Sequence, residues 1–119
     1  MSTIANYPQT LLDQHSRWHM NDPSQGGRRT PMGQAGSGLE FLTFHRTFIA
    51  NFHAWYDSQP NADLDAVAAW TAIPQELKTP RTRWTPVVAA QENRIVNNFP
   101  AFASADELSI YIENGIHNQ

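Results

Sequence analysis

The sequence predicts an all-α protein whose helices are joined by long irregular loops. Apolar residues recur at steps of three and four in several segments, which is the spacing of one helical face. Glycines and prolines gather between those segments, and no stretch alternates apolar and polar residues as a half-buried strand would. The length of 119 residues suits one domain, so residues 1–119 are predicted to form a single domain.

The first predicted helix covers residues 9–20. One face carries residues three or four positions apart: Leu11, Leu12, His15, Trp18 and His19. The helix is expected to end before Pro23, because the residue that precedes a proline disfavours the helical conformation. Residues 22–38 follow with five glycines and two prolines, and we interpret them either as a functional loop or as a disordered connector.

The second predicted helix begins near Ser37 or Gly38 and ends near Asp57. A wide aromatic stripe lies along one of its faces: Phe41, Phe44, Phe48, Phe52 and Trp55. This is the strongest helical pattern in the chain. An apolar helix face of this width needs a partner, so we expect a second copy or a complementary chain to cover the stripe.

An irregular segment is predicted after this helix. Prolines at positions 60, 74, 80 and 86 would interrupt any long helix there. We expect Trp70 and Trp84 to hold the segment against the core.

Two shorter helices are predicted near the C-terminus, over residues 87–97 and 105–114. Ser104 and Glu107 are spaced as a capping box for the second of them. Gly115 is expected to stop that helix.

The composition excludes several classes of function. The chain has no cysteine, which rules out disulfides, thiolate zinc sites and cysteine nucleophiles. The net charge of −3 argues against a nucleic-acid surface. The N-terminus has neither the basic nor the apolar region of a signal peptide, and no run reaches the roughly 18 apolar residues of a membrane span. We therefore expect a cytoplasmic protein that binds neither nucleic acid nor membrane.

Three histidines are candidate metal ligands. His15 and His19 lie four residues apart, so both imidazoles can reach one ion from one helix. His45 lies among the core-facing residues of the second helix and could complete the set. The alternative for His15 is a solvated position beside Asp13, and for His45 a core histidine bonded to a carbonyl or carboxylate. Three neutral imidazoles suit copper or zinc, and composition does not choose between them.

His53 is predicted to support the site without binding the ion. It lies eight residues after His45, which places it about 80° further around the helix. The two imidazoles therefore cannot point at one ion as directly as His15 and His19 can. Packing against aromatic neighbours is the alternative for His53.

Two motifs resemble the tyrosinase family of type 3 copper proteins. Residues 41–46, F-L-T-F-H-R, resemble the family signature F-L-P-W-H-R, and a Gly-Ser-Gly turn precedes them. Residues 113–118, E-N-G-I-H-N, resemble the motif that opens the family's second copper site. His15 and His19 lie on a segment similar to the upstream histidine-bearing helix of bacterial relatives.

The resemblance implies a role for each candidate residue. His15, His19 and His45 would bind the first copper, and His117 would be the first ligand of the second. Arg46 would anchor its helix through a carboxylate, and His53 stands where the family often has a glutamate. No catalytic residue beyond the metal ligands is implied.

The departures from the family pattern limit what one chain can do. Thr43 and Phe44 replace the signature's proline and tryptophan, and Gly36 stands where many relatives have a copper ligand. The further ligands of the second copper do not occur in the sequence, which covers only the first-copper half of a four-helix bundle. We therefore expect one copper from this chain, two in the complete site, and a second copy or a complementary chain as partner.

The predicted function is that of a tyrosinase-like copper oxidoreductase. It would oxidise small phenols or catechols with O2, as a monooxygenase or catechol oxidase, when completed by its partner. One alternative is a non-catalytic module that binds a single copper or zinc ion. The other is an interaction domain whose aromatic face is an interface.

Overall fold

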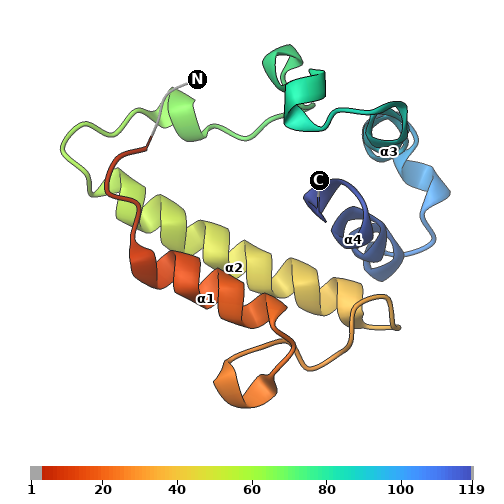
Figure 1. Ribbon diagram of the computed structural model, residues 1–119, viewed down its shortest axis with the longest axis horizontal. Coiled ribbons are helices and arrows are strands. Elements are labelled where there is room, and N and C mark those ends of the chain that lie inside the picture. The colour runs from red at the N-terminus through yellow and green to blue at the C-terminus, as the bar shows by residue number, and fades with distance from the viewer. Residues whose placement is uncertain (1–3, 119) are drawn as a thin grey trace. The chain divides into compact units, whose positions relative to one another are not determined.

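The computed structural model describes residues 4–118, and all of the regular structure in that range is helical. The main helices are α1 (Gln9–His19), α2 (Ser37–Asp57), α3 (Pro86–Asn97) and α4 (Ala105–Asn114), with short 3₁₀ turns between them (Figure 1). The all-α prediction is confirmed. Each of the four predicted helices is present, and α3 begins one residue earlier than predicted because Pro86 suits the first helical position.

The chain divides into two compact units. Unit 1 comprises residues 1–31 and 40–68, and unit 2 comprises residues 32–39 and 69–119. Unit 1 contains α1 and most of α2, whereas unit 2 contains α3, α4 and the first turn of α2. Each unit is described here by itself.

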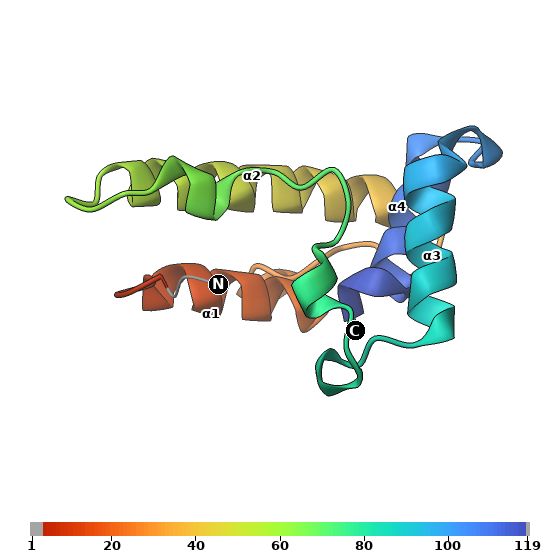
Figure 2. The same ribbon diagram turned by 90° about the horizontal axis from the view of Figure 1, so that it is seen from above.

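In unit 1, α1 and α2 form an antiparallel pair held together by aromatic rings (Figure 2). At one end, Trp18 stacks on Phe44 with ring centres 4.7 Å apart. At the other end, Tyr7 stacks on Phe52 with ring centres 5.4 Å apart. Burial of Tyr7 raises the pKa of its hydroxyl. Within the predicted aromatic stripe Phe41 is buried, and the other four rings are partly buried. That a second copy or another chain covers the stripe stays a prediction.

The first part of the glycine-rich loop folds back onto α1. Arg28 is only 2% exposed, its backbone N–H donates to the Trp18 carbonyl over 3.1 Å, and its guanidinium lies 4.7 Å from the Trp18 ring. The Glu40 carboxylate accepts hydrogen bonds from the backbone N–H groups of Arg29 and Thr30. These contacts attach residues 28–30 to both helices of unit 1.

In unit 2, local caps define both helices. The Thr85 hydroxyl accepts from the Val88 N–H at the start of α3, and the Ser104 hydroxyl accepts from the Glu107 N–H at the start of α4. The predicted capping box differs in one partner. The Glu107 carboxylate accepts a hydrogen bond from the backbone N–H of Ala103, and not from the backbone N–H of Ser104.

Gly115 follows the last residue of α4, so the predicted stop is confirmed. Its φ is −111°, and a Cβ there would lie 3.0 Å from the end of the Gln91 side chain of α3. The glycine therefore leaves room for the Gln91 side chain.

The first turn of α2 is held against α4 within unit 2. The Asp106 carboxylate accepts hydrogen bonds of 2.9 Å from the N–H groups of Gly36 and Leu39, and therefore caps α2 from another helix. Gly38 is buried in this contact. A Cβ at Gly38 would overlap the Asp106 carbonyl oxygen and lie 2.8 Å from the Ile110 nitrogen.

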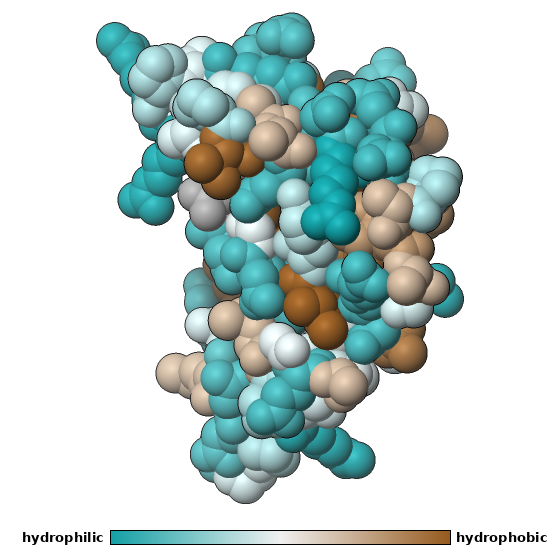
Figure 3. All heavy atoms as spheres, turned by 90° about the vertical axis from the view of Figure 1, so that its right-hand side faces the viewer, coloured by the Kyte–Doolittle hydropathy of each residue, from teal (hydrophilic) through white to brown (hydrophobic). Residues whose placement is uncertain are grey.

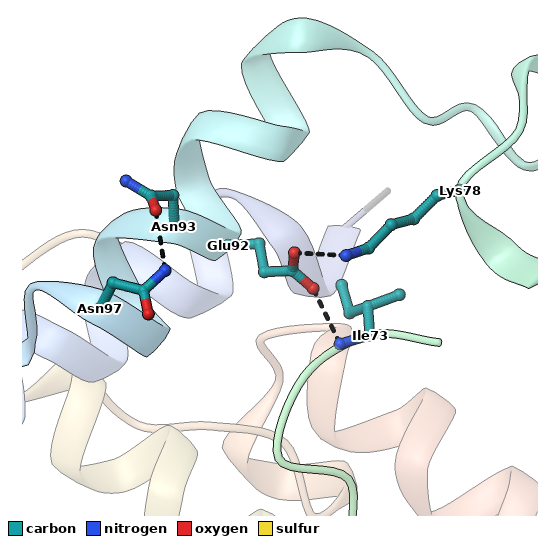
Figure 4. A network of polar contacts seen from close by, with 5 residues as sticks. All are labelled: Ile73, Lys78, Glu92, Asn93 and Asn97. Carbon is teal, nitrogen blue, oxygen red and sulfur yellow. Dashed lines mark hydrogen bonds and ion pairs between the residues drawn. The ribbon is translucent and has the colours of Figure 1, made fainter. Parts of the chain in front are cut away.

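The irregular segment of unit 2 is held mainly by polar contacts. Glu92 on α3 accepts from the Ile73 N–H and pairs with Lys78, both over 2.8 Å (Figure 4). Trp84 is partly buried, with the Lys78 ammonium 5.2 Å from its ring centre. Trp70 is 59% exposed, so the prediction that it holds the segment to the core is wrong.

Two surface properties accompany this fold. None of the helices among residues 4–118 combines the length and apolar character needed to cross a membrane. On the face shown in Figure 3, hydrophilic side chains dominate and hydrophobic ones form small separate groups.

Candidate metal site

Three imidazoles meet where α1 packs against α2. His15 and His19 come from successive turns of α1, and His45 comes from α2. The Nε2 atoms of His15 and His45 are 3.0 Å apart, and those of His15 and His19 are 3.1 Å apart. We call these three residues the imidazole triad. All three are partly buried, and the triad could hold a metal ion.

The spacing of these nitrogens suits a small metal ion. A zinc or copper ion bonds imidazole nitrogen at about 2.0–2.1 Å, so two ligands at a tetrahedral angle would be separated by about 3.3 Å. The observed separations of 3.0 and 3.1 Å differ from this by only a few tenths of an ångström. All of the ligand atoms lie within 4.8 Å of one another, which is compatible with one shared ion.

His45 is oriented by its own helix. Its Nδ1 lies 2.8 Å from the carbonyl oxygen of Phe41, one turn earlier. A carbonyl only accepts, so Nδ1 must carry the proton, and in a neutral ring Nε2 then offers its lone pair. Hydrogen bonds of this kind fix metal-binding histidines in the productive tautomer.

The bond from His45 to the Phe41 carbonyl also assigns part of the hydrogen bonding inside the triad. In neutral His45 the Nε2 atom is an acceptor, so the Nε2–H of His15 can donate to it over 3.0 Å. A single metal ion would instead use the lone pairs of all three Nε2 atoms, which lie close enough together to share one ion.

Aromatic rings surround the triad. His15 stacks on Phe48 with ring centres 4.8 Å apart and on Phe44 at 6.2 Å. The edge of Trp18 meets His19 at 4.9 Å and His45 at 5.4 Å. These contacts restrict the rotation of each imidazole and reduce its access to water.

Among residues 4–118, His53 and Arg46 make other contacts within unit 1 or none. His53 packs edge-on against Phe52, with ring centres 5.6 Å apart. Arg46 is exposed, and within residues 4–118 no carboxylate pairs with its guanidinium. His117 belongs to unit 2, in the turn Ile116–Asn118, where its Nδ1 lies 3.2 Å from the Asn118 side-chain oxygen. Its role in a metal site stays a prediction.

Sequence reasoning missed the Phe41 carbonyl, which orients His45. The signal was present, because a backbone carbonyl four residues before a helical histidine is within reach of Nδ1. The predicted alternative for His45, a bond to a backbone carbonyl, therefore coexists with its metal-binding position.

Comparisons of this chain with protein families, characterised proteins and solved structures find no match.

Proposed function

We propose that this protein binds copper through the imidazole triad and contributes the first-copper half of a tyrosinase-like oxidase of phenols or catechols. The observation that carries the proposal is the convergence of three Nε2 atoms, one of them fixed by the bond from His45 to the Phe41 carbonyl. The resemblance of residues 41–46 and 113–118 to the family motifs supports the same assignment.

Copper is favoured over other metals by the donor set. The triad offers nitrogen only, and the chain has no thiolate to offer. Imidazole suits copper and zinc, and affinity along the divalent series peaks at copper. Calcium and magnesium prefer oxygen ligands and are therefore poor candidates.

The oxidase half of the proposal needs a second copper. A coupled copper pair would supply the two-electron chemistry that oxidises a phenol or catechol with O2. In this chain the triad would hold the first ion, and Phe44, Phe48 and Trp18 would limit the access of water to it. His117 would begin the second ligand set, and a second copy or a complementary chain would supply the rest.

A mononuclear metal site without catalysis is the second candidate. It is favoured because unit 1 by itself brings together one complete set of three imidazoles. Such a site could bind copper or zinc without oxidising a substrate.

Metal titration of matched variants tests the metal site. Purified protein is titrated with Cu(II), and bound copper is measured per chain together with its EPR spectrum. We expect one tightly bound copper with nitrogen coupling. His15→Ala and His45→Ala should abolish tight binding, while His53→Ala serves as the matched control and should bind as the wild type does. Loss of binding in His53→Ala but not in His45→Ala would contradict the assignment.

Spin counting and a catechol assay separate the two candidates. A coupled pair would give an EPR signal much weaker than the copper content, together with quinone formation from 4-tert-butylcatechol. A signal equal to the copper content without quinone formation would support the mononuclear site. The assay is run at several protein concentrations, because an oxidase completed by a second copy should gain specific activity as the concentration rises.

A further inference from the structure

We propose that unit 2 carries a binding site for a small organic carboxylate, anchored by Arg94, in the pocket between α3 and α4. The pocket has a volume of about 320 Å³, which falls within the range of small-ligand sites, about 300–1,000 Å³. The two helices that form it are visible in Figures 1 and 2. This proposal concerns unit 2 alone and does not depend on the metal site.

Arg94 is held by two rings that leave its hydrogen-bond donors available. Its guanidinium carbon lies 4.4 Å from the ring centre of Phe102 and 4.7 Å from that of Tyr111. A cation–π contact places the cation over the face of an aromatic ring and uses none of the guanidinium N–H groups as a hydrogen-bond donor. Within residues 4–118 the Arg94 side chain has no carboxylate partner and donates no hydrogen bond. A flat, immobilised guanidinium of this kind is suited to bidentate binding of a carboxylate.

Further polar groups converge on the same pocket. The Asn114 carboxamide and the Tyr111 hydroxyl line it, and within the described chain neither forms a hydrogen bond. Gln91 also lines it, and its buried carbonyl oxygen has no donor among those residues. A buried polar atom without a partner is destabilising. A ligand that presents both acceptors and a donor would satisfy these groups together.

The lining of the pocket favours an organic carboxylate over inorganic phosphate. Phe102, Ile110 and Tyr111 line the pocket together with Arg94 and Glu107. Apolar side chains can cover the hydrocarbon body of an organic acid, and inorganic phosphate has no such body. One Glu107 oxygen accepts from the Ala103 N–H over 3.1 Å.

An NMR titration with a matched pair of probes tests the site. The isotope-labelled full chain is titrated with benzoate and with benzamide, which has the same shape but no charge. We expect saturable shifts of the Arg94 Nε–H and of the amides of Tyr111 and Asn114. Benzoate should bind roughly tenfold more tightly than benzamide, because charge-assisted hydrogen bonds are about twice as strong as neutral ones. Equal affinities, or no saturation, would overturn the proposal.

Two variants and one competing ligand complete the test. Arg94→Lys keeps the charge but loses the planar fork, so benzoate affinity should fall about tenfold. Arg81→Lys, an exposed arginine outside the pocket, is the control and should bind as the wild type does. Unchanged affinity in Arg94→Lys, or tighter binding of inorganic phosphate than of benzoate, would contradict a carboxylate site. If Arg94→Lys does not fold, the comparison of benzoate with benzamide on the wild-type chain decides alone.

Discussion

At the residue scale, His45 is prepared for a ligand by the backbone of its own helix. The Phe41 carbonyl fixes its Nδ1, so its Nε2 faces His15 as a lone-pair donor. Hydrogen bonds of this kind hold a metal-binding histidine in the productive tautomer, so this contact supports the candidate metal site.

The Asp106 carboxylate should make the stability of the folded protein depend on pH. Hydrogen bonds from the backbone N–H groups of Gly36 and Leu39 lower its pKa below the ordinary value of 3.8, despite an opposing effect of desolvation. Because the folded pKa is depressed, the stabilisation is full above pH 3.8 and is lost as the pH falls through the lower folded pKa.

Asp106→Asn should therefore lower the melting temperature at pH 7 and leave it nearly unchanged at pH 2. Thermal unfolding followed by circular dichroism across this range measures the difference. Asp65→Asn is a suitable control, because Asp65 is exposed and its carboxylate accepts no hydrogen bond within residues 4–118. An equal loss for Asp106→Asn at both pH values would contradict the role assigned to its charge.

Glu40 should stabilise unit 1, and this stabilisation should also be lost as the pH falls. Burial raises its pKa, but the hydrogen bonds from Arg29 and Thr30 and the charge of Arg28 lower it more, so the net pKa falls below 4.5. Glu40→Gln should expose the backbone amides of Arg29 and Thr30 to faster hydrogen exchange at pH 7. Protection equal to that of the wild type would show that the carboxylate does not hold the loop.

At the element scale, side chains close by in the sequence fix where helices α3 and α4 begin. The glycine at position 38, in contrast, is required by contact with another helix, α4. Thr85 and Ser104 cap their own helices, whereas Asp106 caps α2 from α4. The contact between α2 and α4 requires Gly38, because any side chain there would overlap the backbone of α4.

Gly38→Ala should destabilise unit 2 although alanine is the better helix former. The intrinsic gain is about 1 kcal/mol, but overpacking against Asp106 and Ile110 should cost about 1–3 kcal/mol and also weaken the Asp106 cap. Urea unfolding measures the balance. Thr43→Ala, at an exposed position of the same helix, should be neutral or slightly stabilising. A more stable Gly38→Ala variant would contradict the close approach.

Ser104→Ala should lower the free energy of unfolding by about 1 kcal/mol, which is the usual effect of losing an N-cap side chain. The Glu107 N–H would lose its acceptor, while the bond from Ala103 to the Glu107 carboxylate would remain. Urea unfolding again provides the measurement, and Ser104→Asp should restore most of the loss because aspartate also caps helices. Equal stability of the alanine and aspartate variants would show that the cap is unimportant.

At the scale of the whole molecule, metal binding and stability should be linked. A metal that binds the triad only in the folded protein raises the free energy of unfolding. The increase is about 2.7 kcal/mol when the free metal concentration is 100 times the dissociation constant. Zn(II), which has no redox chemistry, should therefore slow hydrogen exchange in α1 and α2. His53→Ala should retain this protection and His19→Ala should lose it. Protection confined to α3 and α4 would place the ion outside the triad.

The features that the sequence alone predicted are local. The positions of the four helices, the Ser104 cap and the spacing of His15 and His19 all follow from residues within about one helical turn of each other. The aromatic stripe of α2 also predicted that His45 would lie in the interface between helices. Such features are legible because helical geometry alone relates the residues that make them.

Other features depend on residues far apart in the chain and became clear only in the folded protein. Examples are the burial of Arg28 on Trp18, the place of Gly38 against α4 and the exposure of Trp70. Local spacing cannot foresee these outcomes, because each is set by how helices and loops pack once their apolar faces are buried. Helical spacing likewise named His15, His19 and His45 as candidate ligands, whereas the distances between their nitrogens depend on how α1 packs against α2.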